Sequence, residues 1–204
     1  ARLERVRPKE STAVIESGRL SPAEPSVELT LVQGIAKGSK MDFVVQKAVE
    51  VGVSRIVPLN SDRTVVRLDE AKADARVERW QRIAYEAAKQ SGRARIPSVA
   101  PVHSWDELWR RDDLGVVFVP WEGEGSQRLL EMVRAVVPAA PVSAATRVQL
   151  TLIIGPEGGF TPEEIDAAQR HGAHPVTLGP RILRTETAGL IAAALVLGAC
   201  GELG

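Results

Sequence analysis

The sequence predicts an α/β fold in which helices cover both faces of a mainly parallel β-sheet. Short apolar runs that are typical of buried strands alternate along most of the chain with segments whose apolar residues recur at helical spacing. Glycine or proline stands at the ends of many of these segments, which is where strands and helices stop. Strands that alternate with helices in this way favour a parallel sheet with helices packed on both sides.

The first half of the chain shows how the individual elements are recognised. A strand is expected over 28–34, and Ser39 is a suitable cap for the helix that follows it and runs to about residue 51. A short buried strand at 55–59 precedes a segment, 70–91, in which apolar residues fall on one face of a long helix. Before these elements, weak alternation predicts one or two strands of a small, incomplete β unit.

The second half continues the alternation. Thr161, Pro162 and Glu164 form the pattern of a capped helix start, with the threonine at the cap and the proline in the first turn. Cys200 follows an alanine- and leucine-rich helix and is expected to be a small buried side chain. In chain order we expect a strand at 98–102, a short helix at 105–109, a strand at 115–119, a helix at 127–136, a loop at 138–146, a strand at 148–154, a helix at 162–171, a strand at 175–178 and a helix at 185–199.

Composition and charge argue against several classes of protein. The chain has 204 residues, of which 44% are hydrophobic and 25% charged, as in ordinary globular domains. Its net charge is zero, which argues against binding nucleic acid through bulk charge but leaves room for a local basic patch. No apolar run approaches the roughly 20 residues of a membrane-spanning helix, so no membrane association is expected. The chain starts with neither a signal-peptide core nor methionine, so we expect it to begin within a larger protein.

The most informative segment is the end of the strand at 148–154, where an apolar run meets the Gly-Pro-Glu-Gly-Gly sequence of residues 155–159. Loops at strand ends are where α/β proteins place small-molecule sites. This loop has neither the P-loop pattern nor a Gly-x-Gly-x-x-Gly pattern, so neither a P-loop nor a dinucleotide-binding loop is expected. Glu157 would repel a phosphate, so an uncharged or cationic ligand group fits better. A tight turn without a ligand is the alternative.

A second glycine-punctuated segment follows at 176–188. It has few charges and leads into a helix, with Thr185 as the expected cap. Backbone groups outside a strand ladder must find partners, and an adenine and a ribose would be suitable ones. An ordinary connection between a strand and a helix is the alternative.

A basic stretch and a pair of histidines are two further candidates for binding sites. Basic residues exceed acidic ones between 76 and 95, which predicts either a face that contacts phosphates or a solvated helix surface. His171 and His174 do not have the spacing of a metal-binding pair on a helix, because Gly172 interrupts it, so no metal is expected.

Four blocks of this sequence together resemble the bacterial 16S ribosomal RNA uracil-N3 methyltransferase family, within the SPOUT class of knotted methyltransferases. The blocks span 37–53, 80–93, 154–160 and 178–188. The resemblance extends over about 27–200. Members of this family have a PUA-like RNA-binding β-barrel before the methyltransferase domain. The resemblance therefore implies that residues 1–26 are the last part of such a barrel and that 27–204 are the methyltransferase domain.

The resemblance implies a deep trefoil knot, S-adenosylmethionine as the cofactor, and a homodimer with the site near its interface. Three loops would hold the cofactor, with Leu178, Ile182 and Leu183 covering its adenine, while Gly155 and Gly179 would allow close approach of the backbone. The residues implied to bind the cofactor are Val119, Pro120, Ile154, Gly155, Pro156, Glu157, Gly158, Leu178, Gly179, Ile182, Leu183, Thr185, Thr187 and Ala188.

The reaction that the resemblance implies is methyl transfer to N3 of a uridine in 16S ribosomal RNA, within the 30S subunit in the cytoplasm. Arg184 is predicted to stabilise negative charge on the uracil, and Glu186 to orient that arginine or handle a proton. The alternative for this pair is a structural ion pair at the helix start. Two other functions stay open: a homologue that binds RNA or cofactor without catalysis, and a SPOUT enzyme that acts on transfer RNA or a ribose hydroxyl. The predicted RNA contacts are Arg63, Arg82, Gln90, Ser91 and Arg93.

Overall fold

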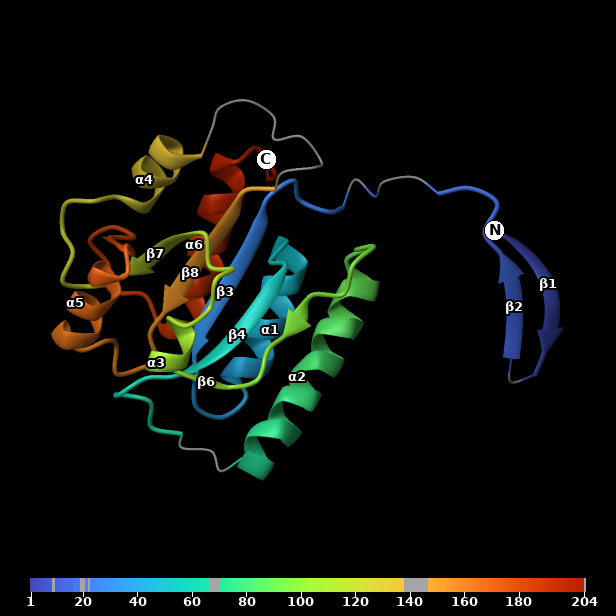
Figure 1. The fold of residues 1–204 in the computed structure, drawn as a ribbon, viewed down its shortest axis with the longest axis horizontal. Helices are drawn as coiled ribbons and strands as arrows, with labels where there is room; N and C mark the ends of the chain where they lie inside the picture. Colours follow the sequence, from blue (N-terminus) through green and yellow to red (C-terminus); the bar gives the residue numbers. More distant parts are fainter. Residues whose placement is uncertain (9, 19–20, 22, 67–69, 138–146, 204) are drawn as a thin grey trace.

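A parallel β-sheet runs through the centre of the computed structural model, with helices on both of its faces (Figure 1). The structure describes residues 1–8, 10–18, 21, 23–66, 70–137 and 147–203. Within these residues every strand pairing of the sheet is parallel, so the predicted mainly parallel α/β fold is confirmed. Across the sheet the strands lie in the order β5 (Ser98–Val99), β4 (Arg55–Asn60), β3 (Glu28–Gly34), β8 (Gln149–Ile154), β7 (Val116–Pro120) and β9 (His174–Val176), with β6 (His103–Ser104) also paired to β4.

Both faces of the sheet are covered because the strands carry apolar residues on both sides. In β3, Leu29 and Leu31 belong to one core and Val32 to the other, since successive strand residues point to opposite faces. In the described part of the chain, no helix is long and apolar enough to cross a membrane. The first core lies under α1 (Lys40–Val51), α2 (Glu70–Gln90), α4 (Leu129–Val136) and α6 (Thr185–Ala199), and the second under α3 (Trp105–Leu108) and α5 (Pro162–Arg170).

The strand expected at 98–102 is wrong in its length. It stops at Val99, because Pro101 has no N–H to donate to a ladder, and pairing with β4 resumes only at β6. Cys200, expected to be buried, is half-buried at the end of α6. The loop expected at 138–146 lies outside the described residues.

The helix starts differ in how well local sequence predicts them. Ser39 does precede α1, but its side chain makes no capping hydrogen bond. The capping box at the start of α5 is confirmed, with Pro162 in the first turn. There the Thr161 hydroxyl accepts from the Glu164 N–H at 3.1 Å, and the Glu164 carboxylate accepts from the Thr161 N–H at 2.9 Å.

The direction in which the chain advances across the sheet reverses at β7 and β8, and such a reversal is where a ligand site is expected. From β7 the chain passes through α4 on one face of the sheet to β8, and from β8 it passes through α5 on the other face to β9. All three strands are parallel, so their carboxyl ends lie at the same edge of the sheet. The crevice outside such an edge is the usual ligand site of open α/β sheets.

The N-terminal residues form an antiparallel hairpin of β1 (Arg2–Arg7) and β2 (Glu10–Val14) that stands apart from the main body (Figure 1). Every residue of both strands is exposed, including Leu3 at 64% and Val6 at 69%. Isolated hairpins are at best marginally stable in water. We therefore keep the prediction that residues 1–26 belong to an incomplete β domain. The exposed apolar side chains of the hairpin support it, because further strands of such a domain would cover them.

A buried ion pair anchors the linker between this hairpin and the sheet. The Glu24 carboxylate accepts hydrogen bonds from Nη2 of Arg93 at 3.0 Å and from the N–H groups of Ala94 at 2.8 Å and Arg95 at 3.0 Å. The side chains of Arg93 and Glu24 are only 4% and 9% exposed. Arg93 also donates to the Val53 carbonyl oxygen at 2.5 Å, so one guanidinium joins the linker to the turn after α1.

The Glu24 contacts predict a pH dependence of stability. Burial would raise the pKa of Glu24, but the bonds from Arg93 and from the backbone of Arg95 and Ala94 hold that pKa below its ordinary value of 4.5. The stabilisation is therefore complete above pH 4.5 and is lost as the pH falls through the lower folded-state pKa. We expect Glu24→Gln to lower the free energy of unfolding by about 3 kcal/mol at neutral pH, and by progressively less in acid, when measured by urea denaturation.

Glu16→Gln is the matched control, because the ion pair of Glu16 with Arg2 is largely exposed. Its loss should change the free energy of unfolding by no more than about 0.5 kcal/mol. If Glu24→Gln is no more damaging than this control, or if its effect does not shrink in acid, the pair does not anchor the linker.

Candidate functional site

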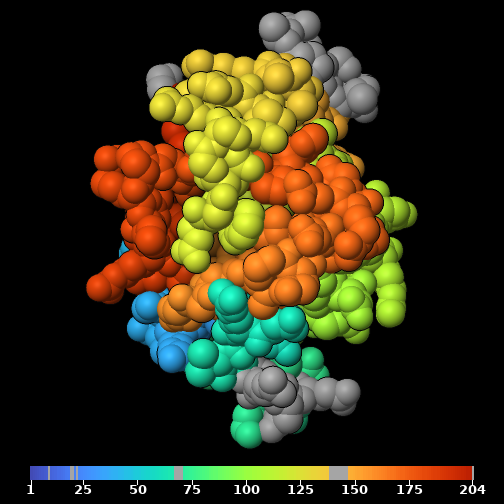
Figure 2. Space-filling model, turned by 90° about the vertical axis from the view of Figure 1, so that its left-hand side faces the viewer, coloured from blue at the N-terminus to red at the C-terminus, as the bar shows by residue number. Residues whose placement is uncertain are grey.

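A pocket of about 740 Å³ lies at the carboxyl ends of β7 and β8. Its walls come from residues 120–128 after β7, from the loop of residues 155–160 after β8 (the Gly155 loop), and from residues 177–188, which lead from β9 into α6. Figure 2 looks onto the face of the molecule where these segments adjoin. The volume lies in the range of roughly 300–1,000 Å³ that is usual for small-molecule sites. The pocket therefore occupies the place that the parallel topology favours.

Most of the residues predicted to bind the cofactor line this pocket, and a few do not. Val119 is fully buried in the core under α3 and α5. Gly158 packs against Arg63, and Thr187 is exposed on α6 next to Ala188, which does line the pocket. The predicted residues that line the pocket are Pro120, Ile154, Gly155, Pro156, Glu157, Leu178, Gly179, Ile182, Leu183, Thr185 and Ala188.

Sequence reasoning missed most of the wall that follows β7. The rule that pointed to the Gly155 loop would have found it, because Trp121 comes directly after β7 as Gly155 comes after β8. Lys40 was also missed, although it lies in a block that carries the family resemblance. The lining residues that were not predicted are Lys40, Trp121, Glu122, Glu124, Gly125, Arg128, Gly159, Phe160, Thr177, Pro180 and Arg181.

The Gly155 loop is packed tightly against the end of β3. A Cβ atom on Gly34 would lie 2.4 Å from the backbone nitrogen of Pro156 and 2.8 Å from the carbonyl carbon of Gly155, so only glycine fits beneath the loop. The loop then enters α5 through the capping box of Thr161 and Glu164. The loop is therefore fixed at both of its ends.

The structure corrects the role expected for Thr185. Arg184 and not Thr185 occupies the N-cap position of α6, and its side chain makes no capping hydrogen bond. Thr185 lies in the first turn, where its hydroxyl donates to the Gly155 carbonyl oxygen at 2.5 Å and accepts from Nε2 of Gln33 at 2.8 Å. The cap prediction failed because the partners of this hydroxyl come from distant strands. The same contacts join α6 to the Gly155 loop.

The residues predicted to cover an adenine differ in their exposure. Leu178 and Leu183 are half-buried, whereas Ile182 is 83% exposed. Gly179 has a φ of +109°, which favours glycine, and among the described residues no atom lies within 4 Å of where its Cβ would be. A larger side chain at 179 would thus be strained by the backbone itself, with or without a ligand nearby.

Three charged side chains meet at one side of the pocket. Nζ of Lys40 is 3.1 Å from Oε1 of Glu157 and 3.3 Å from Oε2 of Glu186. The hydrogen bonds with Glu157 and Glu186 raise the pKa of Lys40. Burial would raise the pKa of Glu157, but the hydrogen bond from the Lys37 N–H and the contact with Lys40 lower it. Two carboxyl groups thus face one ammonium group, which suits an uncharged or cationic ligand group better than a phosphate.

The two residues predicted to carry catalysis lie at the start of α6 but are not paired with each other. Arg184 lines the pocket, and its exposed side chain makes no hydrogen bond or ion pair with any residue that the structure describes. The Glu186 carboxyl group is 17% exposed, and its ion-pair partner is Lys40. The alternative of a structural Arg184–Glu186 pair is therefore absent from the described contacts, and the Arg184 guanidinium is available to a ligand.

The residues predicted to contact RNA do not form one site. Arg63 lies beside the Gly155 loop and donates to the Gly158 carbonyl oxygen at 3.1 Å. Arg82 and Gln90 are exposed on α2, which packs near β5, at the opposite edge of the sheet from β9 (Figure 1). At the end of the same helix the Ser91 hydroxyl is occupied by a bond to a backbone carbonyl oxygen at 2.8 Å.

Arg93 is the clearest correction among these RNA predictions. Its guanidinium is buried in the anchor of the linker, so it cannot reach a phosphate without breaking that anchor. Other basic residues of the stretch are also paired within the chain: Arg79 with Asp42 at 2.7 Å and Lys89 with Glu86 at 3.1 Å. Three of the basic side chains between 76 and 95 are thus paired with acidic residues of the same chain, and a phosphate-contacting role for the others stays a prediction.

The fold and the position of the pocket agree with a known class of protein. A family model described as an RNA methyltransferase domain matches residues 23–197, which is most of the chain. The chain therefore belongs to the RNA methyltransferase domain family.

Similar proteins of this family share one name. The ribosomal RNA small subunit methyltransferase E of Bacillus subtilis is 37% identical over 170 residues, which cover 83% of this chain and 65% of the relative. The protein of the same name from Mycobacterium bovis is 34% identical over 194 residues, which cover 93% of this chain and 68% of the relative. The chain thus spans about two thirds of the length of these relatives.

Solved structures show the same likeness. The crystal structure of a ribosomal RNA small subunit methyltransferase E from Neisseria gonorrhoeae, bound to S-adenosyl methionine, is 36% identical with a TM-score of 0.71 and covers 85% of this chain and 67% of that one. A Legionella pneumophila protein, solved with the bound cofactor SAM, is 33% identical with a TM-score of 0.74 and covers 97% of this chain and 76% of that one.

The packing of β3 beneath the Gly155 loop gives a prediction for Gly34→Ala. The added methyl group would overlap the backbone of Gly155 and Pro156, which cannot move away without disturbing the bond to Thr185. We expect the free energy of unfolding to fall by about 1–3 kcal/mol, as measured by urea denaturation.

Gly125→Ala is the control, because Gly125 lines the pocket but a Cβ there would meet no described atom within 4 Å. Its effect should stay within about 0.5 kcal/mol. Equal effects of the two substitutions would mean that the loop yields easily to a methyl group at 34.

Proposed function

We propose that this chain transfers a methyl group from S-adenosylmethionine to ribosomal RNA of the small ribosomal subunit. The observation that carries the proposal is the pocket at the carboxyl ends of the strands, with its glycine-rich loop and the ion pair of Lys40 with Glu157 in its wall. It is supported by the Neisseria relative, which binds S-adenosyl methionine, and by relatives named for the small-subunit RNA. Because the chain spans 65% of the Bacillus subtilis relative, the activity of the complete protein is part of the proposal.

The pocket fits this cofactor in charge and in polarity. When bound there, S-adenosylmethionine would supply a methyl group that its sulfonium makes electrophilic. The sulfonium is a cation, and Glu157 in the pocket wall offers it a carboxyl group, while Glu186, which does not line the pocket, shares the ammonium group of Lys40 with Glu157. Leu178 and Leu183 offer apolar surface to an adenine, and the exposed backbone of the loops offers hydrogen-bonding groups to its edge. The predicted residues that line the pocket are accordingly the proposed cofactor contacts.

The proposed acceptor is N3 of a uridine base. N3 carries a proton in neutral uridine, and as this proton leaves, negative charge spreads to the neighbouring carbonyl oxygens. N3 would then take the methyl group as the bond between that group and the sulfonium sulfur breaks, which would leave a neutral thioether. Arg184 lines the pocket and can donate hydrogen bonds to that charge. Glu186 is held by Lys40 and can accept the proton, whereas no contact among the described residues supports its other predicted role of orienting Arg184. Positioning and charge stabilisation would then carry the reaction without a covalent enzyme intermediate.

RNA binding is proposed to depend on parts of the chain outside the pocket. We propose residues 1–26 as the last part of a PUA-like barrel, because Leu3 and Val6 are exposed apolar residues of a free hairpin. Among the predicted RNA contacts, Arg63 is the one best placed to guide RNA towards the pocket, since it lies beside the Gly155 loop and bonds to Gly158. Arg82 would contribute from α2. The proposed substrate is 16S RNA within the 30S subunit, in the cytoplasm.

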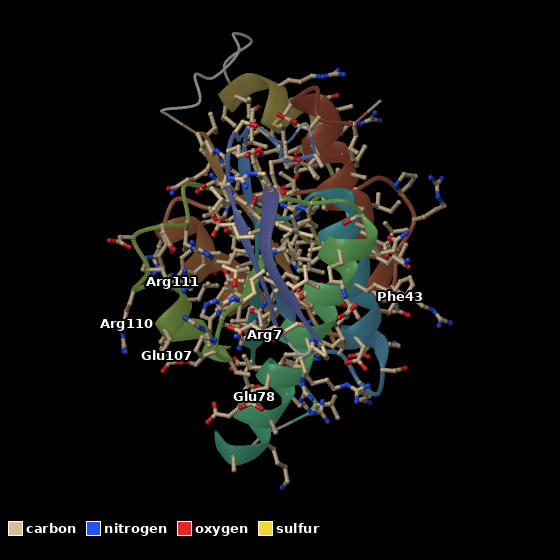
Figure 3. The ribbon with its side chains drawn as sticks, turned by 90° about the vertical axis from the view of Figure 1, so that its right-hand side faces the viewer. Arg7, Phe43, Glu78, Glu107, Arg110 and Arg111 are labelled. Carbon is tan, nitrogen blue, oxygen red and sulfur yellow. The ribbon has the colours of Figure 1, made fainter. Side chains whose placement is uncertain are left out.

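A knotted chain and a homodimer are also part of this proposal. The proposed knot is supported by the return of the chain after β9 to the middle of the sheet, where α6 packs against α1 and bonds to the Gly155 loop. Phe43 on α1 and Ile191 on α6 are 46% and 44% exposed, and Ile182 is 83% exposed beside the pocket. Figure 3 shows Phe43 on the outer side of α1, pointing away from the sheet. A second copy would cover these apolar side chains close to the site.

Cofactor binding is the first test of this function. Calorimetry on this chain should show saturable binding of S-adenosylmethionine and of its demethylated product, and little binding of NAD or ATP, because the pocket has no phosphate loop and presents carboxyl groups. Incubation with 30S subunits, followed by mass spectrometry of the nucleosides, should yield N3-methyluridine. Saturable binding of NAD without S-adenosylmethionine, or methylation of transfer RNA in place of 30S subunits, would contradict the proposal.

Arg184→Ala separates chemistry from cofactor binding. If Arg184 donates to charge that develops on the uracil, its loss should lower the single-turnover rate by about 10²–10³ while the affinity for S-adenosylmethionine stays close to that of the parent. Arg170→Ala, at an exposed arginine on α5, should change neither quantity. A parallel loss of rate and cofactor affinity would show that Arg184 holds the cofactor and not the acceptor.

A further inference from the structure

We infer that Gln33 is a positioning residue that sets the spacing between two walls of the pocket; the inference rests on the cofactor proposed above. Gln33 is the next-to-last residue of β3, and its polar side chain is fully buried next to the apolar residues Leu31 and Val32 of the same strand. It does not itself line the pocket. A buried amide needs hydrogen-bond partners, and its partners lead directly to the pocket walls.

A directed chain of hydrogen bonds starts at this amide. Nε2 of Gln33 donates to the Gly34 carbonyl oxygen at 3.1 Å and to Oγ1 of Thr185 at 2.8 Å. The Gly34 carbonyl can only accept, so the orientation of the amide is determined by its partners. Because the Thr185 hydroxyl accepts from Gln33, its own proton is left for the Gly155 carbonyl oxygen, 2.5 Å away. The chain thus runs from β3 through α6 to the Gly155 loop.

The carbonyl oxygen of the Gln33 amide explains why α6 contains Gly189. Oε1 of Gln33 has no hydrogen-bond partner among the described residues, and a Cβ atom on Gly189 would lie 2.9 Å from it. Glycine is unfavourable inside a helix, and its neighbours here are alanine and leucine. The missing side chain leaves a notch that the Gln33 amide fills. This packing fixes the position of α6 along the direction of β3.

The chain of hydrogen bonds connects two walls of the pocket. Gly155, Thr185 and Ala188 all line the pocket, yet the Gly155 loop and α6 belong to separate parts of the chain. Without the amide, Thr185 and the Gly155 carbonyl lose the partner that fixes their geometry. A bound cofactor would then have to hold the two walls together, at the expense of its own affinity. The expected defect is therefore in cofactor binding rather than in the chemical step.

Gln33→Met and Thr185→Val test this inference, because each keeps the volume and removes part of the bond chain. Calorimetry with S-adenosylmethionine and S-adenosylhomocysteine should show affinity about tenfold weaker for either variant. The double variant should be little weaker than either single one, since both interrupt the same chain. Thr185→Ser retains the hydroxyl and should bind more tightly than Thr185→Val, because it keeps the bond chain that valine removes. In the ligand-free chain, the amides of residues 155–160 should exchange hydrogen faster in Gln33→Met.

Thr151→Val is the matched control, because Thr151 is a buried threonine whose hydroxyl donates to the Leu114 carbonyl oxygen at 2.6 Å, away from the pocket. It should lower the thermal midpoint without changing cofactor affinity. If Gln33→Met behaves like this control, or if Thr185→Ser binds as weakly as Thr185→Val, the inference is wrong and Gln33 is only structural. If Gln33→Met does not fold, Gly189→Ala replaces it, because its added methyl group would displace the Gln33 amide from a position that does not line the pocket, and it should also weaken cofactor binding. Failure of the parent to bind S-adenosylmethionine would instead overturn the proposed function.

Discussion

The close approach of β3 to the Gly155 loop is the constraint on which the rest of this site depends. Gly34 lets the loop backbone cross the end of the strand, and Gln33 beside it holds Thr185 and therefore the start of α6. The Gly155 loop and the start of α6 follow different strands, and both are thus positioned by contacts with the end of β3. Without these contacts, the ion pairs of Lys40 with Glu157 and Glu186 would have to hold the two segments together.

The electrostatic character of the pocket follows from the same arrangement. α1 starts just after β3, so Lys40 in its first turn reaches both Glu157 on the loop and Glu186 on α6. This second link between loop and helix lies on the pocket side and is ionic, whereas the first is buried and neutral. Within this three-residue cluster carboxyl groups outnumber ammonium groups, which favours the proposed sulfonium over a phosphate at the Gly155 loop. Arg184 stands apart from the cluster, and the proposed function assigns it to the acceptor base.

Local patterns in the sequence predicted the elements but not the connections between them. The alternation of strands and helices and the capping box at Thr161 depend on near neighbours, so they could be recognised. The bond between Gln33 and Thr185 joins residues 152 positions apart, and neither residue shows locally that the other is its partner. Arg93 was assigned to RNA for the same reason: it follows the end of a basic helix, and the Glu24 that buries it comes from a distant linker. In both cases the sequence did not reveal which distant residue a polar side chain contacts.

Hydrogen exchange of this chain with and without S-adenosylmethionine tests most directly the claim that three strand-end segments form one cofactor site. At saturation, the account predicts slower exchange of the amides in 120–128, 155–160 and 177–188, and no change along α2. A smaller polar pocket around Arg55 and Asp113 provides an internal comparison. Slower exchange confined to that pocket or to α2, or no change anywhere in the chain, would contradict the account.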